Sequence, residues 1–300
     1  MSRTTASKPR ALEVDAQSAH TPAIVDPTAV IHPSAIVEDG ARIGPYCVLG
    51  PNVRVGKGTV LHSHVVVQTN TTLGEHNEVF PFAVLGPDPQ DLKFRGEDAW
   101  LEIGDRNVIR EHATLHRGTS GGGGYTRVGS GCLLMVGAHV AHDCVLEDNV
   151  ILANGVMLGG HCIVGSGATV AGAAAVHHFT TIGPLAFVAG LARVVKDVPP
   201  YLVVEGSPAE PRKVNTVALT RRGWSDEEVE CVKRAFRCLF RAKGDRKGGE
   251  DETVRQRLAR LREEEAGSKA VITLCDFVER MGDGVHGRWL ETQRIKGASA

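Results

Sequence analysis

Two histidines and an aspartate stand together in residues 137–144, where His139 and His142 flank an aliphatic residue and Asp143 follows directly. A histidine titrates near neutral pH, so it is the natural general base for a hydroxyl or an amine. The neighbouring carboxylate can orient the imidazole of His142 or raise its basicity. Acyl transfer needs such a base and a hydrogen-bond donor for the oxyanion on the attacked carbonyl. These residues therefore indicate acyl-transfer chemistry, provided that the fold brings a donor close to His142.

The elements that position these residues follow from a period of six. Every sixth residue from Val25 to Leu85 is aliphatic, eleven in a row, and so are the twelve from Val128 to Val194. A helix repeats its apolar positions every 3.6 residues or so and a strand about every two, and neither explains this spacing. A three-sided coil does, because each side is a short strand with one aliphatic residue pointing inward. The sequence predicts an all-β solenoid, a parallel β-helix of hexapeptide repeats with between eight and nine coils, followed by an α-helical C-terminal region.

A coil of three repeats has 18 residues, which places Gly160 directly above His142, with His161 beside it. One coil further, His177 and His178 take the same place. Successive coils stack about 4.8 Å apart, so the Gly160 N–H is expected about 5 Å from His142, where an oxyanion would form. We therefore expect five of the thirteen histidines to converge on two or three neighbouring coils.

Two other interpretations of these histidines stay open. Solenoid corners accept histidine, asparagine and aspartate for backbone reasons, so single histidines can be structural. Alternatively, His139, His142 and His161 could supply three nitrogens to zinc. We expect a metal-free site, because the spacing does not match that of the zinc enzymes with this fold.

Two further positions of the repeat allow structural predictions. The residue after the aliphatic one is often glycine, which is expected to help turn the corner. These glycines are Gly44, Gly50, Gly56, Gly104, Gly165 and Gly183. Four cysteines lie four residues after an aliphatic position and are expected to be small, reduced, inward-facing residues. They are Cys47, Cys132, Cys144 and Cys162.

The period lapses twice, and a solenoid accommodates insertions as loops that leave a corner. Loop one covers residues 86–101 and loop two residues 117–127. We expect a disordered tail over residues 1–22, the β-helix over 23–195, and a connecting segment with a helical domain over 196–300. Helices are expected from Pro211 to Arg222, from a capping box at Ser225 and Glu228 to about residue 242, and over residues 250–265 and 268–281.

Bulk composition excludes several classes of protein. The net charge of −1 argues against binding to nucleic acid. No apolar run reaches the length of about 18 residues that a transmembrane helix needs. The basic residues of the N-terminal tail leave targeting to an organelle as an alternative to a cytoplasmic location.

Several motifs outside the repeat closely resemble the UDP-N-acetylglucosamine O-acyltransferases of lipid A biosynthesis. They stand in the family's order at residues 90–93, 103–107, 109–111, 115–119, 138–144, 197–201 and 221–223. The resemblance covers roughly residues 25–242 and implies a left-handed coil, transfer of a 3-hydroxyacyl chain from acyl carrier protein to the sugar 3-hydroxyl, and a homotrimer with active sites between subunits. No cofactor is implied beyond the 4'-phosphopantetheine that the acyl carrier protein brings.

The resemblance also implies roles for single residues. His142 is expected to be the general base, Asp143 its support, and the Gly160 N–H the oxyanion donor. The other residues implied to bind substrate are Gln90, Asp91, Lys93, His139, His161, His177, His178, Gly190, Asn215, Arg221 and Arg222. Among these, Asn215, Arg221 and Arg222 are expected to meet the phosphopantetheine arm or the diphosphate. The acidic carrier protein suits Arg221, Arg222, Arg234, Arg237 and Arg241, although the last three are equally compatible with a solvated helix face.

The chain departs from the family at two ligand-contacting positions, where His178 replaces a glutamine and Val217 a glutamate. Gly190, at the position that limits acyl length, leaves room for a longer chain. The main alternative is the N-acyltransferase of the same pathway, which needs an N-terminal uridine-binding domain larger than the 22 residues before the first coil. Another hexapeptide acyltransferase, or a non-catalytic scaffold with the same fold, is the remaining alternative.

Overall fold

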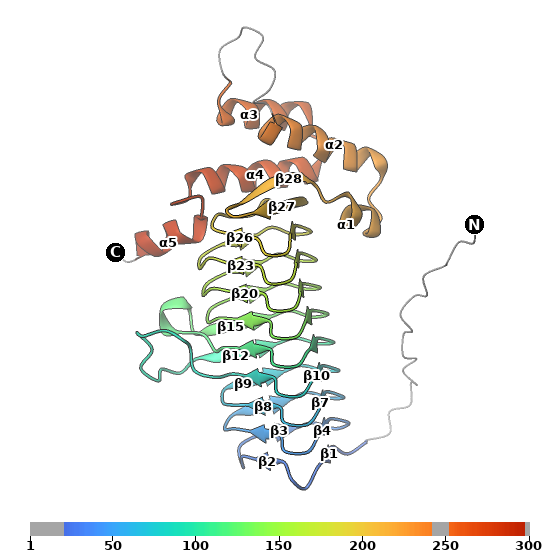
Figure 1. Ribbon diagram of the computed structural model, residues 1–300, viewed down its shortest axis with the longest axis vertical. Helices are drawn as coiled ribbons and strands as arrows, with labels where there is room; N and C mark the ends of the chain where they lie inside the picture. The colour runs from blue at the N-terminus through green and yellow to red at the C-terminus, as the bar shows by residue number, and fades with distance from the viewer. Residues whose placement is uncertain (1–20, 242–251, 298–300) are drawn as a thin grey trace, which may run out of the picture.

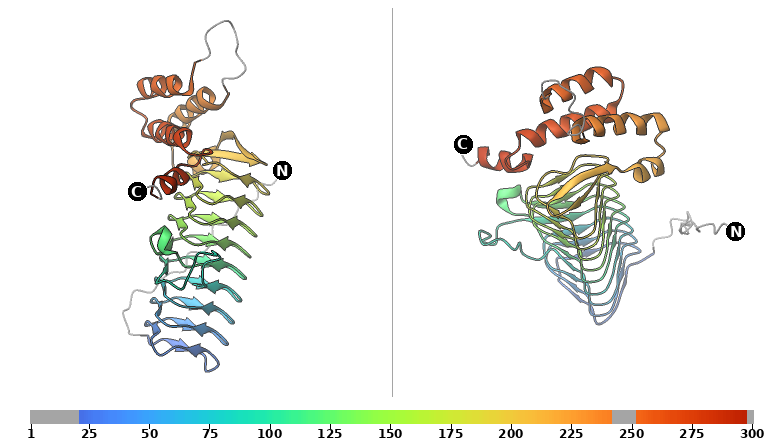
Figure 2. Two further views of the ribbon diagram at one scale, coloured as in Figure 1. Left: turned by 90° about the vertical axis from the view of Figure 1, so that its left-hand side faces the viewer. Right: turned by 45° about the horizontal axis from the view of Figure 1, so that its top comes forward.

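The computed structural model describes residues 21–241 and 252–297, and most of the expected N-terminal tail, residues 1–20, lies outside them. A parallel β-helix forms a tall three-sided prism, and a small helical region covers its C-terminal end (Figure 1). The hexapeptide solenoid that the period predicts is therefore confirmed. The view from above in Figure 2 shows the three sides of the prism.

Three sheets make the sides of the prism. The first holds β1 (Ile24–Val25), β4 (Arg42–Ile43), β7 (Val60–Leu61), β10 (Glu78–Val79), β13 (Val108–Ile109), β16 (Leu133–Leu134), β19 (Ile151–Leu152), β22 (Thr169–Val170), β25 (Phe187–Val188), β27 (Leu202–Gly206) and β28 (Ala209–Val214). The second holds β2 (Val30–Ile31), β5 (Val48–Leu49), β8 (Val66–Val67), β11 (Val84–Leu85), β14 (Thr114–Leu115), β17 (His139–Val140), β20 (Met157–Leu158), β23 (Ala175–Val176) and β26 (Arg193–Val194). The third holds β3 (Ile36–Val37), β6 (Val53–Val55), β9 (Thr71–Leu73), β12 (Trp100–Ile103), β15 (Tyr125–Val128), β18 (Val145–Leu146), β21 (Ile163–Val164) and β24 (Thr181–Ile182).

The strands stack in the register that the period requires. Val140 pairs with Leu158 and Leu146 with Val164, so each residue lies beside the one 18 positions later. The aliphatic positions point inward and form one continuous core, in which Leu134, Val140 and Leu152 are fully buried. The four cysteines of the repeat are buried in the same core as free thiols, as expected.

The glycines that follow the aliphatic positions were expected to help turn the corners, but other residues make these turns. The backbone turns through positive φ two residues after the expected glycine, in most of these corners at a non-glycine residue such as Tyr46 or Asn52, both with φ of 57°. The coil below holds this conformation, since the Asn52 N–H donates to the Ser34 hydroxyl at 3.1 Å. Gly50 is required for another reason, because a Cβ there would overlap the carbonyl group of Gln68 in the next coil. These glycines therefore serve close stacking of the coils and do not supply the turn.

Both insertions leave the prism at the same corner. Loop one connects β11 to β12 and loop two connects β14 to β15, so each passes from the second sheet to the third. Loop two contains a short 3-10 helix, Ser120–Gly122. The two loops project from one side of the prism in Figures 1 and 2, and this corner between the second and third sheets is called the loop corner below.

The C-terminal region begins with a hairpin and continues as helices. The helices are α1 (Thr216–Arg221), α2 (Asp226–Phe236) with a π-helical turn (Arg237–Arg241), α3 (Val254–Glu264), α4 (Lys269–Asp283) and α5 (Trp289–Gly297). The capping box of Ser225 and Glu228 is present, and the helices expected over 250–265 and 268–281 are confirmed as α3 and α4. No described helix is long and apolar enough to cross a bilayer.

The expectation that Pro211 begins a helix was wrong. Pro211 lies in β28, the outermost strand of the first sheet, and α1 begins after Asn215, whose side chain accepts from the Ala218 N–H. An edge strand tolerates proline, because the missing N–H need not bond to a neighbour. The sequence also did not reveal α5.

Asp197 joins the top of the prism to the segment before α5. The titration of its carboxyl allows this contact to be tested through the pH dependence of stability. Burial raises the pKa of its carboxyl to about 6 from the ordinary 3.8, even though the Thr181 and Trp289 N–H groups donate to it. A folded-state pKa above the unfolded value stabilises the fold at low pH, and this contribution is lost as pH rises through about 6.

Asp197→Asn lacks this titration, so the wild type should gain about 2 kcal/mol relative to the variant as pH falls from about 8 to 4. Urea unfolding of both proteins across that range measures the difference. A free-energy difference that does not change with pH would show that the carboxyl titrates normally.

Candidate active site

Six histidines gather at or beside the loop corner, and we call them the histidine column. They are His116, His139, His142, His161, His177 and His178. His142 lies in the turn between β17 and β18, and Gly160 with His161 lies in the next turn above, between β20 and β21. The turn above that, between β23 and β24, carries His177 and His178. The five histidines expected to converge do so, and His116, which was not among the residues implied to bind substrate, joins them.

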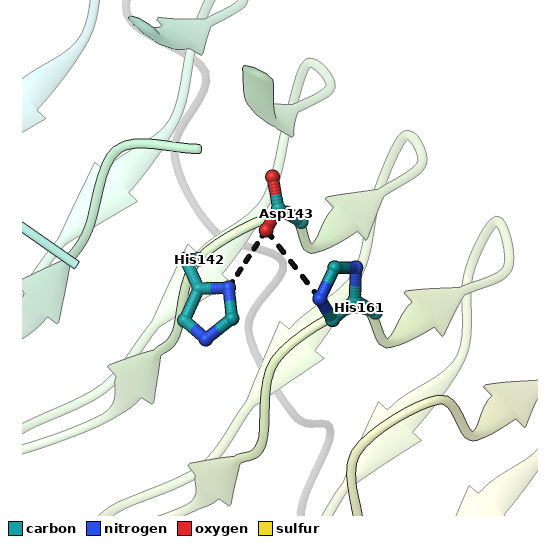
Figure 3. Close-up of side chains that lie close together, drawn as sticks. All are labelled: His142, Asp143 and His161. Carbon is teal, nitrogen blue, oxygen red and sulfur yellow. Dashed lines mark hydrogen bonds and ion pairs between the residues drawn. The ribbon is translucent and has the colours of Figure 1, made fainter. Parts of the chain in front are cut away.

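Asp143 orients His142 from an almost fully enclosed position. Its Oδ2 lies 2.7 Å from His142 Nδ1, as Figure 3 shows. Loop two completes the arrangement, because the Thr119 N–H donates to Oδ1 and the Thr119 hydroxyl to Oδ2, both at 2.7 Å. Burial would raise the pKa of Asp143, but the hydrogen bonds from His142 and Thr119 outweigh it and lower that pKa. Asp143 is therefore a carboxylate at neutral pH, so Nδ1 of His142 carries the proton and Nε2 is free to act as a base.

Gly160 lies directly against the imidazole of His142. A Cβ built on Gly160 would be 2.6 Å from Cε1 and 2.8 Å from Nε2 of that ring. Only glycine therefore allows the ring to occupy this place. Among the described residues, no acceptor takes the Gly160 N–H, whereas the following His161 N–H donates to the His142 carbonyl at 3.0 Å. A base and an unused backbone donor thus lie side by side.

His161 extends the cluster one coil above His142. Its Nε2 lies 3.6 Å from Asp143 Oδ2, and its ring stands at 89° to that of His142 (Figure 3). The other face of the ring stacks on Phe179, with centroids 4.2 Å apart. Burial lowers the pKa of His161, which keeps this ring neutral at pH 7.

The set of groups near enough to share a metal ion differs from the three histidines of the zinc alternative. His142, Asp143 and His161 have ligand atoms within 4.8 Å of one another, whereas His139 is not in this set. Both oxygens of Asp143 already accept hydrogen bonds from Thr119 or His142. An ion would have to displace these bonds, so the arrangement suits an oriented base better than a metal ligand.

His139 and His116 line the corner just below His142. The Thr114 hydroxyl lies 2.8 Å from His139 Nδ1, and the two histidine rings are 5.2 Å apart, edge to face. His116 Nδ1 lies 2.6 Å from the Asp88 carbonyl oxygen in loop one. Burial lowers the pKa of both histidines, so both are neutral donors or acceptors at pH 7. Its place one coil below Ala141, between the positions of His139 and His142 and across the second insertion, was the available sequence signal for His116.

Loop one is held to the loop corner by Arg117, another residue that sequence reasoning did not single out. Its buried guanidinium donates to the carbonyl oxygens of Gly86 and Ala99, at the two ends of the loop, at 3.1 and 3.2 Å. It also pairs with the carboxylate of Asp88. Gln90, Asp91 and Lys93 follow in the same loop; Asp91 is partly buried, whereas Gln90 and Lys93 are exposed.

Arg117→Lys should loosen loop one, because an ammonium group cannot span three acceptors in the planar arrangement of a guanidinium. We expect a loss of about 2 kcal/mol in the free energy of unfolding and faster tryptic cleavage after Lys93 or Arg95. Urea unfolding and timed proteolysis measure both. Arg127→Lys is the matched control, since Arg127 is half exposed, forms an ion pair with Glu102 and lies over the ring of Tyr125. Equal losses in the two variants would contradict the anchoring role.

Four of the residues implied to bind substrate do not join the histidine column within one chain. Gly190 lies in the turn between β25 and β26, at the corner between the first and second sheets. Asn215 donates to the carbonyl oxygen of Leu185 in the turn between β24 and β25, at the third corner. Arg222 lies near Gly167 at that same corner, and Arg221 precedes it on α1. Each corner of the prism faces a different direction, so within one chain these four residues lie apart from the histidine column.

The sequence matches two family models. One, described as UDP-N-acetylglucosamine O-acyltransferase, domain 2, matches residues 197–286. The other, the bacterial transferase hexapeptide of six repeats, matches residues 34–69 and 125–160. Helix α5 thus lies beyond the residues that the first model matches.

Three comparisons illustrate the likeness to known proteins. The acyl-[acyl-carrier-protein]–UDP-N-acetylglucosamine O-acyltransferase of Synechocystis sp. is 47% identical over 55% of this chain and 60% of its own length. The enzyme of the same name from Myxococcus xanthus is 46% identical over 70% of this chain and 78% of its own length. The crystal structure of the UDP-N-acetylglucosamine O-acyltransferase of Moraxella catarrhalis is 41% identical, with a TM-score of 0.77 over 84% of this chain and 96% of that one. The match to the first of these relatives therefore spans three-fifths of that protein.

Proposed function

Because the chain belongs to the UDP-N-acetylglucosamine O-acyltransferase family, we propose that it transfers a 3-hydroxyacyl chain from acyl carrier protein to the 3-hydroxyl of UDP-N-acetylglucosamine. This reaction is the first step of lipid A biosynthesis. The observation that carries the proposal is the contact between the Asp143-bound imidazole of His142 and Gly160. It joins an oriented base to a free backbone donor, which are the two groups that acyl transfer needs.

His142 starts the reaction in this scheme. Its Nε2 takes the proton from the sugar 3-hydroxyl while that oxygen attacks the thioester carbonyl carbon. The resulting imidazolium is stabilised by Asp143, which is a carboxylate because its pKa is lowered by the hydrogen bonds that outweigh its burial. Thr119 keeps that carboxylate in place, so loop two acts as a support for the base.

The tetrahedral intermediate then collapses. The Gly160 N–H donates to the oxyanion, where a preorganised donor stabilises developing charge most effectively. The carbon–sulfur bond breaks, and His142 returns its proton to the departing thiol of the phosphopantetheine arm. The products are the 3-O-acyl sugar nucleotide and the free carrier protein, and the imidazole is neutral again.

Asp91, Lys93, His139 and His161 are proposed to line the acceptor and acyl sites around this centre, with Gln90, His177 and His178 at its edges. Their support is position: they lie in loop one or in the histidine column. Gly190, Asn215, Arg221 and Arg222 would reach the same substrates from another copy of the chain. We therefore propose a homotrimer, in which three-fold packing of the prisms brings one subunit's other corners against its neighbour's loop corner.

Acyl carrier protein is proposed to dock on the helical region at the top of the prism. Arg221, Arg222 and Arg237 are exposed there, which suits an acidic partner. Arg234 is less available, because it pairs with Glu265 at 2.7 Å. Arg241 donates to the Arg212 carbonyl oxygen at 2.8 Å. We place the reaction in the cytoplasm, where the carrier protein and the sugar nucleotide meet.

The proposal is tested with purified protein, 3-hydroxyacyl carrier proteins of graded chain length, and two acceptors. One acceptor is UDP-N-acetylglucosamine and the other carries an amine in place of the 3-hydroxyl. Mass spectrometry should detect a 3-O-acyl product from the first. Transfer to the amine alone would favour the N-acyltransferase reaction, and no transfer to either would contradict the proposed function. Stoichiometric zinc in the active protein would contradict the metal-free mechanism.

A further inference from the structure

Helix α5 lies at the loop corner, above the turns that carry the histidine column. Figures 1 and 2 show it on the side of the prism from which both loops project. The residues that the family model matches end at residue 286, before this helix begins. The proposed function assigns no role to α5, yet its side chains approach residues of the histidine column.

The start of α5 is fastened to the last coil by both backbone and side chains. Asp197 accepts from the Trp289 N–H at 2.9 Å, and its own N–H donates to the Gly287 carbonyl at 2.8 Å. The buried guanidinium of Arg288 donates to the Val195 carbonyl at 2.9 Å. The helix is therefore held in a defined position above His178.

Glu291 is the centre of the contact between α5 and the column. Its carboxylate is only 7% exposed and pairs with Arg294, with Arg288 Nη2 at 3.6 Å and with His178 Nε2 at 3.8 Å. Its Oε2 has no hydrogen-bond partner among the described residues. Arg294 also lies over the ring of Phe179, 5.3 Å from its centroid. One buried anion thus holds two arginines and faces a histidine of the column.

Where α5 meets the histidine column, two acidic side chains are buried and two basic ones are exposed. The carboxylates of Glu291 and Asp197 are buried, whereas the side chains of Arg294 and His178 are 49% and 52% exposed. A ligand at the loop corner therefore meets cationic and imidazole donors while the anions lie behind them. Arg294 uses two of its five guanidinium donors on Glu291, which leaves the others for a ligand.

We infer that Arg294 and His178 form a phosphate-binding subsite, with Glu291 as the residue that positions both. The inference rests on the proposed function, in which both substrates carry phosphate. The acceptor has a diphosphate, and the donor has a phosphodiester in its pantetheine arm. His178 lies two coils above His142, about 10 Å along the prism. That separation suits a phosphate group connected to the reacting atoms by several bonds.

The test compares wild type, Arg294→Gln and Arg294→Lys by calorimetry with three ligands. These are UDP-N-acetylglucosamine, a 3-hydroxyacyl phosphopantetheine and the matching 3-hydroxyacyl pantetheine without phosphate. Arg294→Gln should weaken binding of one phosphate-bearing ligand about tenfold, the usual effect of losing a charged hydrogen bond. The ligand that is affected identifies the source of the phosphate. Arg294→Lys should restore most of the affinity, and acyl pantetheine should bind all the proteins equally.

Arg255→Gln is the matched control, since Arg255 is an exposed arginine in an ion pair with Asp283, at the end of α4. The inference is overturned if Arg294→Gln binds both phosphate-bearing ligands like the wild type, or if Arg255→Gln shows the same loss. Turnover is measured separately. If the wild type binds these ligands but forms no product, the proposed function is contradicted and the phosphate subsite is not. The binding constants then still test the subsite.

Discussion

His142→Ala is expected to lower kcat for acyl transfer by about a thousandfold, within the range that general-base catalysis contributes. The imidazole is the group that removes the proton in the proposed scheme, and it is the imidazole that lies within 2.7 Å of the Asp143 carboxylate. The Kd of UDP-N-acetylglucosamine should change little, because the side chain of His142 is mostly enclosed by Asp143 and Gly160. Steady-state kinetics with calorimetry separates the two effects.

His64→Ala is the control for this variant. His64 is also a corner histidine, but it lies between β7 and β8 on a different edge of the prism, stacked between Tyr46 and Phe82. It should retain wild-type kcat. A His142→Ala protein that keeps full activity would show that another group is the base.

Gly160→Ala is expected to lower kcat by about a hundredfold, the usual consequence of moving a catalytic group by roughly 1 Å. The added methyl would lie 2.6 Å from Cε1 of His142, so the ring must shift. That shift strains the 2.7 Å bond to Asp143 and moves Nε2 away from the substrate hydroxyl. The N–H of residue 160 remains, so the loss reports on the position of the base and not on removal of the oxyanion donor.

Gly172→Ala is matched to it closely. Gly172 occupies the same position of its repeat, two residues after an aliphatic residue, and an added Cβ would be 3.5 Å from the Asn154 carbonyl oxygen, an ordinary contact. Thermal unfolding of both variants shows whether the coils still stack. If Gly160→Ala folds and turns over like Gly172→Ala, the tight contact with His142 has no catalytic importance.

The repeat explains which parts of this site could be predicted from the sequence. Each inward aliphatic residue fixes the position of its strand, and the backbone bonds between coils then place every residue beside the one 18 positions later. For this reason the stacking of Gly160 and His161 on His142 followed from counting. The capping box before α2 was also readable, because it depends on residues three positions apart.

The contacts made by the loops and the terminal helix could not be predicted from the six-residue period. The period does not predict that Thr119, which precedes a run of four glycines, donates to both oxygens of Asp143. Nor does it predict that Arg117 bonds to the two ends of loop one. Gly190 and Asn215, which the resemblance implies to bind substrate, lie at different corners of the prism within one chain.

The sequence by itself therefore determined the solenoid, its 18-residue register and the position of Gly160 against His142. Only the tertiary structure decided which loop supports Asp143, which corner each substrate-binding candidate occupies, and that α5 brings Glu291 and Arg294 to His178. The physical reason is the range of the interactions. A repeat sets its register by short-range hydrogen bonds and by one inward side chain per strand, which a period reveals. Loops and a terminal helix find their places through packing between residues far apart in the chain, for which no local pattern exists.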